Sequence, residues 1–173
     1  MSIILGYDPT TLRERVDLTA ATRRLDELGE QRSLSAITER AALLRLVGRL
    51  DDAWDASNEA LRLARFAGER TQITRARIRR AVVQQYQGRL EGAFRELSDC
   101  VDEARTHGWS NVEAYALQHR GRVLFDQREY EAALEDFRTS LLLRKKNNSS
   151  TDQVEAALIA VAVTETFVEG GSV

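Results

Sequence analysis

The stretch "HRGRVLFDQREYEAALEDFRTSLLLRKK", from His119 to Lys146, has two counterparts earlier in the chain, each displaced by a further forty residues. The aligned segments are "RAALLRLVGRLDDAWDASNEALRLAR" from Arg40, "RAVVQQYQGRLEGAFRELSDCVDEAR" from Arg80 and "RGRVLFDQREYEAALEDFRTSLLLRK" from Arg120, and they need no gap. A fixed period of this size is typical of arrays in which similar units stack on one another. The stretch is therefore one copy of a repeat and not an isolated hairpin.

The composition is that of a soluble helical protein. The chain has 173 residues, of which 30% are charged and 6% aromatic, with one proline, and this profile disfavours β-sandwiches and disordered tails. The net charge of -2 predicts no nucleic-acid partner. The lone Cys100 excludes an intrachain disulfide, "MSIILGYDPT" has no basic leader, and the longest apolar run, Ala156–Val163, is too short to span a membrane. We expect a cytoplasmic protein, and the excess of arginine over lysine favours a bacterial source.

Within the repeat, apolar residues recur with the spacing of a helix. Tyr130 is followed three and four positions later by Ala133 and Leu134, these two by Phe137, and Phe137 by Leu141 four positions on, which predicts an amphipathic helix. No segment sustains the alternation of a strand, so the expected fold is all-α and contains no sheet. The predicted helices cover 11–28, 34–47, 51–67, 71–87, 91–107, 111–126, 131–146 and 151–168.

The breaks between the predicted helices repeat as well. Glycine and asparagine tolerate the left-handed conformation that closes a helix, and they occupy five of six such positions. The six are Gly48, Gly88 and Arg128 inside the copies, and Gly68, Gly108 and Asn148 between them. Capping boxes are predicted for Thr11 with Glu14, Ser110 with Glu113, and Ser150 with Gln153.

Small residues form columns at three repeat positions. These columns are Ala41, Ala81 and Gly121; Ala36, Ala76, Ala116 and Ala156; and Ala53, Ala93 and Ala133. Small side chains let paired helices approach closely. A single helical hairpin cannot cover its own apolar face, so the copies are expected to stack as a solenoid.

The repeated pattern, glycine followed by leucine or tyrosine, then alanine and a large residue, resembles the second half of the tetratricopeptide repeat. The small residues Ala41, Ala81 and Gly121 match that family's Gly/Ala position, although the leucine usual just before it is replaced by Arg40, Arg80 and Arg120. A forty-residue period is similar to the long-repeat branch of the family. The resemblance implies a right-handed α-solenoid of antiparallel helix hairpins, a tetratricopeptide-like superhelix. The expected organisation is one domain, 1–173, with a leading helix 11–28, hairpins 34–68, 71–108 and 111–148, and a terminal helix 151–168.

An enzyme is not expected. The chain has no Gly-rich phosphate loop, no His-Glu-x-x-His motif, no cysteine pair and only two histidines. Cys100 falls in a column of small residues, which indicates a packed thiol, and His107 falls at a helix end. We therefore predict neither a catalytic residue nor a metal, and no cofactor.

In the tetratricopeptide family the first helix of each hairpin lines a concave groove, so the resemblance implies a site for a protein or peptide segment that carries negative charge. It places in this groove Thr38, Ala42, Arg45, Arg79, Gln85, Tyr115, Gln118, His119, Arg122 and Phe125. The expected function is a non-enzymatic scaffold that binds a protein segment. The alternative is a peptide- or ligand-sensing module of a bacterial transcriptional or signalling regulator.

Two further features leave more than one interpretation open. Arg40, Arg80 and Arg120 lie one repeat apart, so they either form an anion-binding stripe or each pair locally with a carboxylate or a helix-end carbonyl. The last predicted helix is apolar around its circumference, which predicts a homodimer through Leu158, Ile159, Val163 and Phe167. The competing explanations are cover by the apolar "SIILGY" segment or by a further domain.

Overall fold

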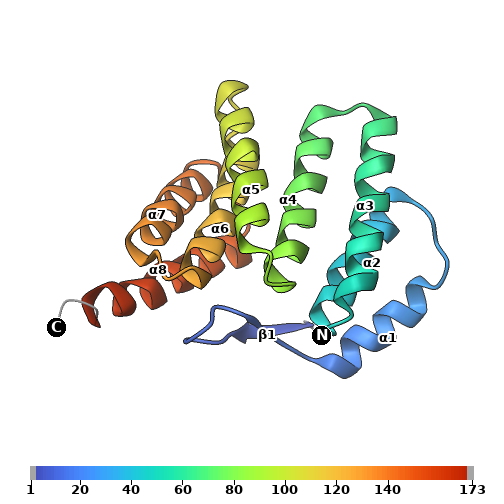
Figure 1. Ribbon diagram of the computed structural model, residues 1–173, viewed down its shortest axis with the longest axis horizontal. Helices are drawn as coiled ribbons and strands as arrows, with labels where there is room; N and C mark the ends of the chain where they lie inside the picture. The colour runs from blue at the N-terminus through green and yellow to red at the C-terminus, as the bar shows by residue number, and fades with distance from the viewer. Residues whose placement is uncertain (1–2, 171–173) are drawn as a thin grey trace. The chain divides into compact units, whose positions relative to one another are not determined.

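The computed structural model describes residues 3–170, and over these residues it contains eight helices and one two-stranded sheet (Figure 1). The sheet is formed by β1 (Ile4–Tyr7) and β2 (Glu14–Val16). The helices are α1 (Leu18–Leu28), α2 (Leu34–Leu46), α3 (Leu50–Ala67), α4 (Arg70–Tyr86), α5 (Leu90–Thr106), α6 (Ser110–Asp126), α7 (Tyr130–Lys146) and α8 (Thr151–Gly170). The all-α class is confirmed, and the helices from α2 onward begin and end within two residues of their predicted bounds.

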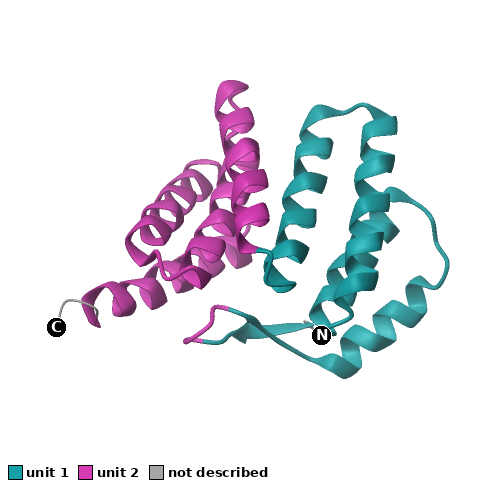
Figure 2. Cartoon of the chain, in the orientation of Figure 1, with its two compact units in different colours: residues 1–8, 13–89 teal, residues 9–12, 90–173 magenta. Residues whose placement is uncertain are grey.

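The chain divides into two compact units (Figure 2). Unit 1 combines Met1–Asp8 with Arg13–Arg89, and unit 2 combines Pro9–Leu12 with Leu90–Val173. In unit 1, α1 packs on α2, α2 on α3 and α3 on α4, and α2 also contacts α4; in unit 2, α5 packs on α6, α6 on α7 and α7 on α8. Each unit is therefore a solenoid-like stack of helices. The division between the units falls inside the hairpin predicted for 71–108. The single domain expected for 1–173 stays a prediction.

All six predicted helix breaks adopt the left-handed conformation. Their φ angles are 81° at Gly48, 80° at Gly68, 76° at Gly88, 66° at Gly108, 65° at Arg128 and 51° at Asn148. After α6, the backbone N–H of Arg128 donates to the Phe125 carbonyl at 3.0 Å and that of Glu129 donates to Leu124 at 2.9 Å. This pair of bonds is a Schellman motif, which satisfies the last carbonyls of the helix. The repeated breaks are therefore helix-closing turns, as predicted.

Arg128 has a side chain where the other copies have glycine, and this difference is testable. A left-handed φ costs a non-glycine residue about 1–2 kcal/mol, and Arg128 is exposed. We expect Arg128→Gly to raise the free energy of unfolding by about 0.5–1 kcal/mol, measured by thermal denaturation, after allowance for the greater unfolded-state freedom of glycine. The reverse change at the equivalent position, Gly88→Arg, is the control and should lower stability. An Arg128→Gly protein no more stable than the wild type would contradict this account.

The N-terminal segment departs from the prediction. Residues 11–17, expected to open a helix, instead contain β2, which pairs antiparallel with β1 in the register Tyr7↔Glu14. Helix α1 is capped by Asp17, whose carboxylate accepts from the Ala20 N–H at 2.9 Å, and not by Thr11. Pro9 lies in the turn between the two strands, where its missing N–H costs no ladder hydrogen bond. The expectations of no sheet and of a capping box at Thr11 are wrong.

The capping box predicted at Ser110 is also wrong. Helix α6 begins at Ser110, and no side chain caps it. The Ser110 hydroxyl donates instead to the Asn147 side-chain oxygen at 3.1 Å, and Glu113 pairs with Arg105 at 2.6 Å. Both side chains are therefore used for contacts between helices.

The small-residue columns lie in the cores of the units, except for Ala156, which is half-buried. Ala53, Ala93 and Ala133 are all fully buried. Gly121 lies so close to Phe137 that a Cβ atom added to the glycine would be 2.6 Å from the Cε1 atom of the phenylalanine ring. The third copy thus pairs its smallest residue with a large ring, and close helix contact is achieved there by complementary sizes.

Candidate peptide-binding face

The residues predicted for the groove lie on α2 and α4 in unit 1 and on α6 in unit 2. In unit 1, Ala42 is exposed, while Thr38 and Arg79 are half-buried. Gln85 is buried at 3% exposure. Because α2 contacts α4, Thr38, Ala42 and Arg79 belong to one pair of neighbouring helices. They are the accessible part of the predicted site in unit 1.

Arg45 does not line an open groove, because the N-terminal hairpin covers it. Its guanidinium Nη1 and Nη2 atoms lie 3.3 and 3.4 Å from the two carboxylate oxygens of Glu14 on β2. The two side chains are only 10% and 6% exposed. The expectation for Arg45 is corrected accordingly: an arginine predicted to meet a partner meets a carboxylate of its own chain.

Tyr86 completes the environment of Glu14. Its hydroxyl, at the end of α4, donates to the same carboxylate. Its ring lies between two guanidiniums, with Cζ of Arg13 4.2 Å and Cζ of Arg45 4.4 Å from the ring centroid, as in cation–π pairs. Burial raises the pKa of Tyr86 above its ordinary value, with Arg45 opposing the rise and Glu14 adding to it. The phenol therefore remains a hydrogen-bond donor at neutral pH.

In unit 2 the predicted residues divide between the surface and the core of α6. Tyr115 and His119 are half-buried and form an edge-to-face pair with ring centroids 4.8 Å apart. Gln118 accepts from the Ser140 hydroxyl of α7 at 3.4 Å and is buried, as is Arg122. Phe125 packs edge-to-face on Phe167. Gln118 contacts α7, Phe125 contacts α8 and Arg122 is buried. The expectation that these three residues lie on the surface was therefore wrong.

Sequence reasoning missed residues of the hairpin and of α4 that contact the predicted groove residues. Glu14 and Tyr86 enclose the Arg45 side chain in unit 1. In unit 2, Leu12 at the hairpin tip is 3% exposed and belongs to one hydrophobic cluster with Leu124 and Phe125. The available signal was the Asp8-Pro9 turn between two apolar segments, which is typical of a hairpin as much as of a helix start.

The arginine row is structural. Arg40 donates to the carbonyls of Gly29 and Gln31 at 2.5 and 2.9 Å, beyond the end of α1. Arg80 contacts the Asn58 side-chain oxygen at 3.3 Å. The local pairing anticipated for these residues is therefore observed, with an amide oxygen as the acceptor for Arg80.

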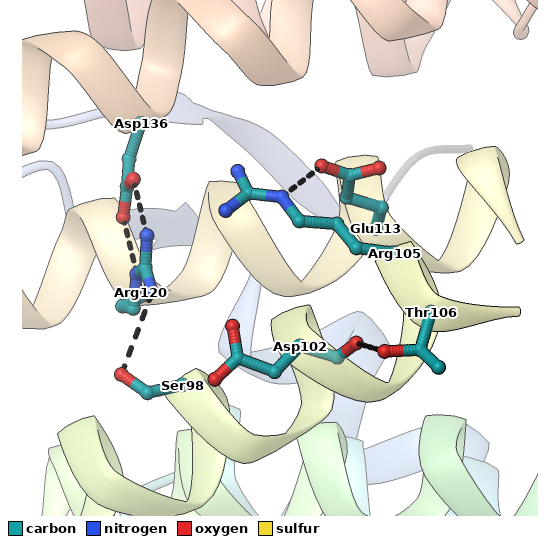
Figure 3. A network of polar contacts seen from close by, with 7 residues as sticks. All are labelled: Ser98, Asp102, Arg105, Thr106, Glu113, Arg120 and Asp136. Carbon is teal, nitrogen blue, oxygen red and sulfur yellow. Dashed lines mark hydrogen bonds and ion pairs between the residues drawn. The ribbon is translucent and has the colours of Figure 1, made fainter. Parts of the chain in front are cut away.

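Arg120 makes the strongest contacts of the row (Figure 3). Its Nε and Nη2 atoms donate to the two carboxylate oxygens of Asp136 on α7 at 2.7 and 2.8 Å, and Nη1 reaches Ser98 of α5 at 3.5 Å. The hydrogen bonds to Asp136 raise the pKa of Arg120 although burial opposes the rise. One side chain thus joins three successive helices of unit 2.

The apolar face predicted for a homodimer is exposed only in part. Leu158 and Ile159 on α8 are 43% and 38% exposed. Val163 and Phe167 are half-buried and pack against the cluster that contains Phe125. The dimer and its four interface residues stay predictions, and Leu158 and Ile159 are the most exposed of the four.

A separate open pocket of about 650 Å³ lies in unit 1 at the turns that follow α2 and α4. Trp54 lines it, with the Arg89 guanidinium 4.1 Å from the Trp54 ring centroid. None of the predicted groove residues lines this pocket. It is therefore distinct from the predicted site.

Comparison with known proteins adds information on the fold alone. No family model matches the chain, and no curated protein matches it. Among solved structures, the crystal structure of BtubC (BKLC) from P. vanneervenii is similar, with a TM-score of 0.61 and 14% identity over 87% of this chain. The matched region covers 65% of that chain's length. Together with the helix packing, this similarity defines the protein as an all-α, solenoid-like helical array.

The structure also bears on membrane insertion. Among residues 3–170, no helix combines the length and the apolarity that crossing a bilayer requires.

Proposed function

We propose that the chain is a non-enzymatic scaffold of the tetratricopeptide type that binds a protein segment on the first helices of its hairpins. The observation that carries the proposal is the division of side chains on these helices. The sides that meet neighbouring helices are closed by small and apolar residues, while Ala42 is exposed and Thr38, Arg79, Tyr115 and His119 are only half-buried. Arginine and aromatic side chains are enriched where proteins bind one another.

Charge supports an acidic or polar segment as the partner. Arg79 offers a guanidinium that can bind a carboxylate in two-point fashion, and the Tyr115–His119 pair offers an aromatic surface with polar edges. Repeat arrays present such side chains along extended surfaces suited to a segment of chain.

A random peptide library displayed on phage provides the test, because it presents many candidate segments to the protein at once. Each peptide selected on the wild-type protein is expected to lose affinity by about tenfold or more with the variant of the unit that it binds, Arg79→Ala in unit 1 or Tyr115→Ala in unit 2, since each removes one contact worth about 1–3 kcal/mol. Affinities are measured by fluorescence anisotropy with purified variants whose thermal stability has been checked.

Matched controls lie on the second helices. Arg62 on α3 and Arg95 on α5 have side chains that are 74% and 73% exposed, one in each unit. Arg62→Ala and Arg95→Ala should leave peptide affinity unchanged. Selected peptides that lose affinity with these controls, and not with Arg79→Ala or Tyr115→Ala, would place binding on the opposite helices and refute the proposal.

A further inference from the structure

Glu14 is held in the manner of a bound ligand. Its two oxygens face the two terminal nitrogens of Arg45 on α2, and one of them also accepts from the Tyr86 hydroxyl on α4. A guanidinium that meets both oxygens of a carboxylate fixes its orientation as well as its charge. Arg45 and Tyr86 belong to the helical array, whereas the carboxylate of Glu14 comes from a segment outside the repeats.

The segment that supplies the carboxylate is a short hairpin. Its strands contain four and three residues, and an isolated two-stranded hairpin is at best marginally stable in water. Ile4 and Leu5 on β1 are exposed. Beyond Glu14, Ile3 and Val16 pack against a hydrophobic cluster of unit 1 that contains Leu28 and Leu43, and Arg13 lies on the Tyr86 ring. Release of the hairpin therefore requires the loss of this packing together with the Glu14–Arg45 ion pair.

Release would leave Arg45 in a costly state. Its side chain is only 10% exposed, and a guanidinium that is largely removed from water requires a compensating negative charge. A neutral occupant would not provide one. The site is therefore selective for a carboxylate from whichever chain supplies it.

We propose that Arg45 and Tyr86 form a carboxylate-binding site, which Glu14 of the same chain occupies in this structure. When an acidic partner segment binds, an aspartate or glutamate of that segment replaces Glu14 in the site. This inference rests on the proposed function and specifies the chemistry of the partner. The N-terminal hairpin is then an internal competitor, and it lowers the apparent affinity for the partner in proportion to the fraction of molecules in which the site is vacated.

The experiment uses the full chain and a defined probe, a fluorescently labelled peptide with the sequence of residues 3–17, "IILGYDPTTLRERVD". We expect the peptide to bind the Glu14→Ala protein about tenfold or more tightly than the wild type, because the internal carboxylate no longer competes. A peptide that carries Glu14→Gln should bind the Glu14→Ala protein about tenfold more weakly than the unaltered peptide. Val16→Ala in the protein weakens the packing of the hairpin on unit 1 but alters neither Glu14 nor Arg45, so it should also increase binding over the wild type.

Two further proteins locate the site. Glu14→Ala combined with Arg45→Ala removes both charges of the ion pair and should abolish the gain. Glu59 on α3, paired with Arg62 at 3.8 Å, provides the control Glu59→Ala, which removes a carboxylate elsewhere in unit 1 and should bind the peptide as the wild type does.

The inference is overturned if the peptide binds the wild type and the Glu14→Ala protein equally, if it binds neither, or if its Glu14→Gln form binds as well as the original. These outcomes are separate from failure of the scaffold function. Phage-selected peptides that depend on Arg79 and Tyr115, but are indifferent to Glu14→Ala and Arg45→Ala, would retain the scaffold and reject the carboxylate site.

Discussion

Replacement of Arg120 by leucine is expected to lower the free energy of unfolding by about 3 kcal/mol, because it strands a carboxylate in the interior of unit 2. The Asp136 side chain is only 8% exposed and receives two hydrogen bonds from Arg120. Removal of one member of a buried pair leaves the other charge without compensation, and urea denaturation followed by circular dichroism measures the loss.

The companion variant removes both charges. Arg120→Leu with Asp136→Ala introduces at the second position the residue that the first copy carries there, Ala56. This double variant should lose less stability than Arg120→Leu alone, since no charge is left buried. Arg138→Leu is the surface control, because Arg138 and Glu165 are 60% and 40% exposed and the loss should be about 1 kcal/mol or less. Equal losses for Arg120→Leu and Arg138→Leu would show that burial of the pair is unimportant.

Gly121→Ala is expected to lower the free energy of unfolding by about 1–3 kcal/mol, although alanine is the better helix former by about 1 kcal/mol. The added Cβ atom would lie 2.6 and 2.8 Å from the Cε1 and Cδ1 atoms of Phe137. Phe137 is fully buried, so its ring cannot move away without disturbing its neighbours. The thermal midpoint should fall in proportion.

A second substitution tests whether the two sizes compensate. The second copy carries Ala81 and Leu97 at the positions of Gly121 and Phe137. Gly121→Ala combined with Phe137→Leu recreates that combination, and its loss of stability should be smaller than the sum of the two single losses. Strictly additive losses would mean that the ring and the added methyl group do not meet.

The helices could be predicted because their signals are local and repeated. Each copy carries the same apolar spacing, and each turn places a residue in the left-handed region, as at Gly88 and Arg128. The repeat made even Arg128 recognisable, since its position and not its residue type identified the turn. Signals that recur at a fixed period reinforce one another, which an isolated segment does not allow.

The hairpin and the burial of the site residues depend on contacts between distant parts of the sequence. Glu14 is separated by 31 residues from Arg45 and by 72 from Tyr86. The N-terminal segment lies outside the repeats, so the period carries no information about it. On α6, Gln118 was predicted to be accessible, but Ser140 of α7 contacts it, and no spacing within one helix reveals which face a neighbour will cover.

The chain's two tryptophans are divided between the units, with Trp54 in unit 1 and Trp109 in unit 2. Trp54 borders an open pocket, and Trp109 stacks on His107 with ring centroids 4.7 Å apart. The intrinsic fluorescence therefore contains one signal from each half of the chain, and Trp54→Phe or Trp109→Phe isolates the other. In a repeat array, stability is approximately a sum of unit and neighbour terms. The difference between the two single-tryptophan denaturation midpoints thus measures how cooperatively the halves unfold.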